Sequence, residues 1–132
     1  MVCTAVPPTN CRSSVKTMPV VYVIAPDWTM RTAVRAGLRE ISINALGMES
    51  GDEAGHAIAS GRLPNVIVLE ATAELFSDPM IQNHVQRVPA ILIASRTVTV
   101  SLPDPAAVLY RPIRIAEIVA RVRELLARNH AA

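Results

Sequence analysis

Few side chains in this sequence could carry out chemistry alone or in pairs. The three histidines, His56, His84 and His130, lie far apart along the chain, and none has a cysteine or a carboxylate at metal-ligand spacing. The two cysteines, Cys3 and Cys11, both lie in the first residues of the chain, where a lone pair is more often two free thiols than a disulfide or half a metal site. The sequence therefore predicts no metal site and no disulfide.

The first apolar run is not followed by a phosphate-binding loop. Residues 20–25 lead into Pro-Asp-Trp-Thr, which contains no glycine, so dinucleotide or flavin binding is poorly supported. The sequence also contains neither a P-loop nor a nucleophile elbow. Trp28 could stack on a ligand or a partner, although we expect it to shield the top of the fold. We therefore predict no enzymatic activity and no cofactor.

The elements that position these residues alternate between strands and helices. Apolar runs predict buried strands at 20–25, 65–69, 90–94 and 107–110 and a weaker strand at 43–48. Helix starts are marked by Asp27, by Ser50 with Glu53, and by Ser77 or Asp78 before Pro79. The last helix, about 114–128, has the clearest apolar period. This alternation predicts an α/β fold with a doubly wound, five-stranded parallel sheet.

Two segments depart from this pattern. Residues 1–18 are rich in Pro, Thr, Ser and Asn, and we expect a disordered tail before a single domain at 19–130. Residues 96–106 stand where a fourth helix would lie, but they combine β-branched residues with Pro103 and Pro105. We expect that helix to be lost or reduced to a turn.

The composition excludes several classes of partner. Hydrophobic residues make up 51% of the chain and the net charge is only +2, which does not indicate binding to nucleic acid or to a membrane. The arginines of the last helix alternate with Glu117 and Glu124, so we expect a solvated face with the pairs Glu117–Arg121 and Glu124–Arg128. No secretory signal is evident, and we expect a cytoplasmic protein.

Three phrases, in this order and spacing, resemble the response-regulator receiver domain over about residues 19–128. They are 64–70 (PNVIVLE), 88–94 (VPAILIA), and Arg111-Pro112 leading into 118–126 (IVARVRELL). The resemblance implies a flavodoxin-like, receiver-like sheet whose site lies at the carboxyl ends of the strands. It also implies a role in two-component signal transduction.

The family's functional residues are replaced at the matching positions. An acidic pair that holds Mg²⁺ is matched by Ala25 and Pro26, with Asp27 following. The phosphoacceptor aspartate is matched by Glu70, and the lysine before Pro112 by Arg111.

The remaining family positions are also changed. The hydroxyl residue is matched by Ala94, with Ser95 one place later, and the aromatic switch residue by Val108, with Tyr110 out of register. A hard cation that is bound through few protein carboxylates binds much more weakly when two of them are lost. We therefore expect no metal at this site and no phosphorylation by the usual Mg²⁺-dependent route.

Glu70 and Arg111 remain as an opposite pair at the strand ends. Our hypothesis is that they form an ion pair in which the guanidinium partly replaces the metal and the lysine. A simple solvated carboxylate at Glu70 is the alternative. Glutamate also carries its charge further than aspartate, so the site could resemble a permanently switched state.

These replacements favour an atypical pseudo-receiver that regulates a signalling or transcription protein, with a histidine kinase as one candidate, through protein–protein interaction. The alternative is a phosphorelay regulator that uses Glu70 or Asp27 as a non-standard acceptor. Loss of the fourth helix would uncover apolar surface, which we expect the segment 96–106, a second copy in a homodimer, or both to cover. The candidate interaction surface comprises Val108, Tyr110, Arg114, Ile118 and Arg121.

Overall fold

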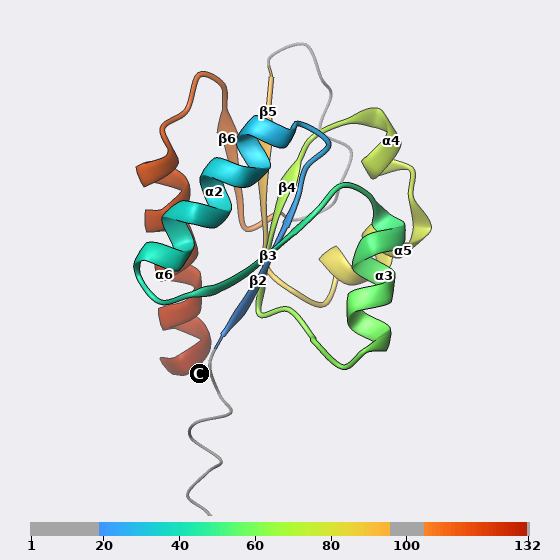
Figure 1. Ribbon diagram of the computed structural model, residues 1–132, viewed down its shortest axis with the longest axis horizontal. Helices are drawn as coiled ribbons and strands as arrows, with labels where there is room; N and C mark the ends of the chain where they lie inside the picture. Colours follow the sequence, from blue (N-terminus) through green and yellow to red (C-terminus); the bar gives the residue numbers. More distant parts are fainter. Residues whose placement is uncertain (1–18, 96–104, 132) are drawn as a thin grey trace, which may run out of the picture.

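The computed structural model describes residues 19–95 and 105–131, which fold into a parallel sheet between two layers of helices (Figure 1). The strands are β2 (Val20–Ile24), β3 (Asn44–Met48), β4 (Val66–Glu70), β5 (Ala90–Ala94) and β6 (Ala107–Tyr110). The helices are α2 (Trp28–Glu40), α3 (Gly51–Ala59), α4 (Ala73–Phe76), α5 (Pro79–Val85) and α6 (Ile115–Ala131). All neighbouring strands are parallel and their order is β3-β2-β4-β5-β6, which confirms the predicted doubly wound sheet.

Helices cover both faces of the sheet, so the central strands have no polar side (Figure 1). One face packs against α3, α4 and α5 and buries Tyr22, Leu69 and Leu92; the other packs against α2 and α6 and buries Val23 and Ile91. Successive side chains of a strand point to opposite faces, so a strand covered on both sides needs a continuous apolar run. Tyr22 shows the cost of a polar atom here: burial raises its pKa, and its hydroxyl donates to the Arg62 carbonyl.

The predicted helix caps all form. Asp27 Oδ1 accepts the Thr29 N–H at 3.0 Å, Ser50 Oγ accepts the Glu53 N–H at 3.4 Å, and Asp78 Oδ1 accepts the Met80 N–H at 2.9 Å. Each contact satisfies an amide that the first helical turn leaves without a partner.

One short helix and one ion pair differ from the sequence-based expectation. The four residues of α4 were not predicted, because the helix is too short to show a period. On α6, Arg121 pairs with Glu124 at 3.3 Å rather than with Glu117. Glu117 instead accepts the backbone N–H of Arg114 at the start of the helix, which draws its carboxylate away from Arg121.

Two expectations fall on residues that are not described. The disordered tail at 1–18 and all but the last two residues of the segment 96–106 lie outside the described ranges, so the lost fourth helix stays a prediction. Among the described helices, none combines the length and the apolar character that a membrane span requires.

Candidate functional site

The carboxyl ends of β2, β4 and β6 bring three charged residues together. In the order β3-β2-β4-β5-β6, the chain leaves β2 toward one edge of the sheet and then returns to the other side of it at β4. A crevice at such a reversal is the usual binding site of doubly wound folds. Asp27 follows β2, Glu70 ends β4 and Arg111 follows β6, so all three meet at this crevice.

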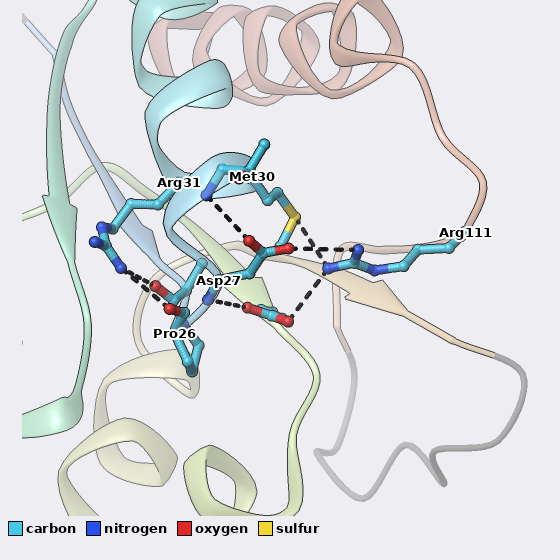
Figure 2. Close-up of polar contacts among 8 residues, drawn as sticks. Pro26, Asp27, Met30, Arg31 and Arg111 are labelled. Carbon is cyan, nitrogen blue, oxygen red and sulfur yellow. Dashed lines mark hydrogen bonds and ion pairs between the residues drawn. The ribbon is translucent and has the colours of Figure 1, made fainter.

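Glu70 accepts two hydrogen bonds, and Arg111 donates to Glu70 and Met30 and forms an ion pair with Asp27 (Figure 2). Arg111 Nη2 lies 3.2 Å from Glu70 Oε2, and Arg111 Nη1 lies 3.8 Å from Asp27 Oδ2. Glu70 Oε1 accepts the backbone N–H of Asp27 at 3.0 Å, and Arg111 Nη2 also lies 3.5 Å from Met30 Sδ. The predicted Glu70–Arg111 pair therefore forms. We call Asp27, Glu70 and Arg111 the strand-end network.

The network is only partly open to solvent. The side chain of Glu70 is 16% exposed, whereas those of Arg111 and Asp27 are 39% and 40% exposed. A carboxylate that loses most of its water needs charged or N–H partners, and Glu70 has both. Glu70 is therefore the least exposed member, and protein partners replace most of its water.

A second guanidinium, which the sequence analysis did not predict, reaches the same strand end from α2. Arg31 Nη1 donates to the carbonyl of Ala25 at 2.6 Å and lies 3.4 Å from the carbonyl of Pro26 (Figure 2). A side chain that bonds to a backbone carbonyl leaves no pairing pattern in a sequence. Two cationic groups thus flank the end of β2, one on each side of Asp27.

Solved structures with the same fold come from bacterial signalling proteins. The chain is similar to a response regulator receiver protein from Burkholderia phymatum, with 22% identity and a TM-score of 0.67 over 83% of this chain and 95% of that one. It is also similar to the signal receiver domain of an HD domain-containing protein from Pseudomonas fluorescens Pf-5, with 13% identity and a TM-score of 0.72 over 86% and 98% of the two chains. No family model and no curated protein matches the sequence.

The chain has the receiver fold. A response regulator from Thermotoga maritima, 13% identical, shares it with a TM-score of 0.65 over 83% of this chain and 98% of that one. The flavodoxin-like strand order and the length of the match agree with the predicted architecture.

Within the receiver fold, the remaining positions singled out in the sequence line the same edge. Ala25 and Ala94 are buried, and the carbonyl of Ala94 accepts the N–H of Arg111 at 2.8 Å. Pro26 and Pro112 are exposed, the Arg111–Pro112 peptide bond is cis, and Ser95 is half-buried just after β5. The alanines contribute no side-chain oxygen to the crevice.

These groups do not suit the Mg²⁺ that the receiver fold implies. Mg²⁺ requires oxygen ligands in octahedral geometry, and Ala25 and Pro26 supply none from their side chains. The carboxylates of Glu70 and Asp27 already face the guanidinium of Arg111. The carbonyl of Ala25 accepts a hydrogen bond from the guanidinium of Arg31. Among the described residues, no group of three or more His, Cys, Asp or Glu side chains could hold a metal ion.

A groove of about 550 Å³ opens beside the network, between the first turns of α2 and the loop that joins β6 to α6. Asp27 and Arg111 form its polar wall, and its apolar wall includes Met30, Ile113 and Ile115. A group placed in this groove would therefore contact two members of the network directly.

The predicted interaction surface is only partly a surface. Tyr110 is 51% exposed, Arg114 and Arg121 are exposed, and Val108 is half-buried. Ile118 is wrong as a surface residue: it is completely buried on the inward face of α6, in the core with Val21, Val34 and Ile91. The apolar stripe that identified α6 as a helix also places this residue inside.

Trp28 does not shield the sheet as expected. Its side chain is 66% exposed, the largest exposed fraction among the large hydrophobic residues of the described chain. It is the first residue of α2, while the helix buries its Val34 and Leu38 face. The apolar positions of α2 thus close the core without this indole.

Proposed function

We propose that the chain is an atypical receiver-like module that regulates a signalling or transcription protein by binding it, without phosphorylation. The observation that supports this most is that the oxygens of Glu70 in the strand-end network already have partners. Glu70 stands where the resemblance places the phosphoacceptor, and its two oxygens face Arg111 and the Asp27 N–H. An acceptor already held by these partners is not a free nucleophile.

The chemistry of phosphoryl transfer supports the same proposal. Transfer to a carboxylate requires cations that neutralise the charge on the phosphoryl oxygens. At this crevice the cations are guanidinium groups, and their N–H donors already contact Glu70 and the carbonyl of Ala25. A metal-dependent reaction would require these contacts to be broken first.

The network also provides one fixed arrangement of the site. Arg111 contacts residues from the loop after β2 and from the end of β4, so it ties three strand ends together. The groove at Asp27 and Arg111 exposes this arrangement to a partner. In this proposal the state of the module depends on its expression and its partner, and it works in the cytoplasm without catalysing a reaction.

A homodimer is the finer part of the proposal. Tyr110 at the end of the edge strand β6 is half-exposed, Arg114 is exposed just before α6, and Arg121 is exposed on α6. A twofold contact through these residues would cover the aromatic side chain. Size-exclusion chromatography with light scattering should show a dimer that Tyr110→Glu dissociates, and a monomeric wild-type chain would contradict this part.

Intact mass spectrometry tests the central claim. The chain is incubated with Mg²⁺ and an acyl phosphate, alongside a response regulator that accepts phosphate from the same donor. We expect the control protein to gain about 80 Da, the mass of one phosphoryl group, and this chain to gain nothing. A stable adduct on this chain, lost in Glu70→Gln or Asp27→Asn, would instead establish the phosphorelay alternative.

A further inference from the structure

The outer surface of α2 carries a line of four residues, Trp28, Arg31, Arg35 and Arg39, which we call the α2 stripe. Separations of three, four and four residues place them along one side of a helix. Trp28 is 66% exposed, Arg35 and Arg39 are exposed, and Arg31 is half-buried. α2 covers one face of the sheet (Figure 1), and the exposed positions of Trp28, Arg35 and Arg39 leave this side of the helix open to solvent.

No described carboxylate neutralises the arginines of the stripe. Within residues 19–95 and 105–131, the ion pairs involve Arg111 and Arg121 but none of Arg31, Arg35 and Arg39. Their contacts go to backbone carbonyls instead: Arg35 Nε lies 3.3 Å and Arg39 Nη2 lies 3.4 Å from the carbonyl of Ala45. A guanidinium has five N–H donors, so most donors of Arg35 and Arg39 remain for another acceptor.

The arginine stems are held in place by the edge of the sheet. A Cβ atom on Gly47 would lie 3.2 Å from Arg31 Cγ and 3.6 Å from Arg35 Cδ, so both stems lie over the bare backbone of β3. Side chains that are already ordered lose less entropy when they bind. Exposed Trp and ordered Arg side chains are also the residue types that contribute most at protein interfaces.

This chain does not supply a matching acidic segment from its own undescribed parts. Residues 1–18 contain no Asp or Glu, and residues 96–104 contain only Asp104. One carboxylate cannot neutralise three arginines. The stripe therefore points to a partner outside the chain.

The surroundings of the stripe favour a protein over a long polyanion. The guanidinium of Arg31 lies 3.4 Å from the carbonyl of Pro26. Pro26 in turn borders a pocket of about 440 Å³. Four of the residues that line this pocket are acidic: Glu49, Glu53, Glu74 and Asp78. A nucleic acid that followed the stripe past this end would meet like charge, whereas a short peptide segment would stop before it. Single-stranded nucleic acid also requires a series of aromatic platforms, and the stripe has one.

We propose that the α2 stripe is the docking surface for an acidic helix of a partner protein. Arginines four residues apart are about 6 Å apart along the axis, the same spacing as carboxylates at every fourth position of a facing helix. A strand is a poor fit, because Arg35 and Arg39 already occupy the carbonyl of Ala45 at the edge of β3. The Trp28 ring would pack against an apolar residue one turn beyond the last carboxylate. This inference rests on the proposed function, because it names the kind of protein that the module binds.

The test uses a labelled helical peptide with glutamate at every fourth position and a leucine one turn beyond, and its matched peptide with glutamine. Fluorescence anisotropy with the full chain should give saturable binding of the glutamate peptide that weakens as salt rises. Arg35→Glu with Arg39→Glu should raise Kd by at least about tenfold, and Trp28→Ala by about fivefold. Arg128→Glu, which reverses the charge of an exposed arginine on a different helix, α6, should change Kd by less than about twofold.

Circular dichroism confirms that each variant is folded, and Arg35→Lys with Arg39→Lys should recover part of the binding because it keeps the charge. The inference is overturned if the glutamine peptide binds equally well, if the charge reversal has no effect, or if a single-stranded oligonucleotide binds more tightly than the glutamate peptide. It is also overturned if the charge reversal dissociates an oligomer of the free chain, because the occupant is then a second copy. A phosphoryl adduct in the mass experiment would refute the proposed function, whereas failed peptide binding without an adduct would refute only the stripe.

Discussion

Arginines are held in two different ways in this molecule. In the strand-end network, Arg111 faces the carboxylates of Glu70 and Asp27 at 3.2 and 3.8 Å. On the α2 stripe, Arg35 and Arg39 contact a single backbone carbonyl and no described carboxylate. The first arrangement satisfies its charge within the fold, while the second leaves its charge available. Arginine therefore holds strand ends together in one region and, in our proposal, binds a partner protein in the other.

Reversing the charge of Glu70 should have the largest effect on this contrast. Glu70→Lys places an ammonium group beside Arg111 at a position only 16% exposed, and we expect the free energy of unfolding to fall by about 2 kcal/mol. Urea denaturation followed by circular dichroism measures it. Glu40→Lys, an exposed change on α2, should cost less than about 0.5 kcal/mol. Equal losses in the two variants would show that the network has no special role.

A double-mutant cycle should give a smaller but specific effect. Glu70→Gln and Arg111→Gln, alone and together, should show a coupling energy of about 1 kcal/mol, because the pair is partly shielded and each member has further partners. The measurement is again urea denaturation. Additive losses would mean that Glu70 is a solvated carboxylate whose contact with Arg111 carries no energy.

The same cycle on α6 provides a benchmark with nearly the same geometry. Arg121 and Glu124 are 3.3 Å apart, but their side chains are 50% and 55% exposed. We expect a coupling of about 0.3 kcal/mol for Arg121→Gln with Glu124→Gln, because water screens the pair and both side chains are flexible. A coupling as large as that of Glu70 and Arg111 would show that burial is not what distinguishes the network.

Neutralising the arginines of the stripe should leave stability almost unchanged. Arg35→Gln with Arg39→Gln should alter the free energy of unfolding by less than about 0.5 kcal/mol, since both residues are exposed and contact only the carbonyl of Ala45. Thermal unfolding followed by circular dichroism measures it. A loss above about 1.5 kcal/mol would indicate that these arginines serve the fold, and the contrast between the two regions would then disappear.

The sequence predicted the regular part of the fold because burial on both sides forces a simple pattern. The short runs around Val23, Val68 and Ile91 are typical of strands covered by helices on both faces. Asp27 and Asp78 mark helix starts by chemistry that is local in the chain. The Glu70–Arg111 pair was also predictable, because Glu70 ends one strand, Arg111 follows another, and the resemblance places both strand ends at one crevice. Periodicity gave no sign of α4, which is shorter than the pattern that would reveal it.

The contacts that were missed depend on competition in space. Arg31 reaches the carbonyl of Ala25, and Arg111 reaches Met30 from 81 residues away; neither leaves a mark in the sequence. The predicted pair of Arg121 with Glu117 was wrong because the backbone N–H of Arg114 donates to the Glu117 carboxylate, and Arg121 pairs with Glu124 instead. Trp28 was expected to cover the sheet because indole rings are often buried. In the structure Val34 and Leu38 form the buried face of α2, and Trp28 lies outside it.

Asp27 belongs to the strand-end network and also caps α2, the helix that carries the stripe. Its Oδ1 accepts the N–H of Thr29 in the first turn of α2, its Oδ2 faces Arg111, and its own N–H is bonded to Glu70. A protein that tilted or shifted the beginning of α2 would therefore have to stretch at least one of these three contacts. In our proposal, a protein bound on the outside of α2 would therefore change the geometry of the crevice through the contacts of this one aspartate.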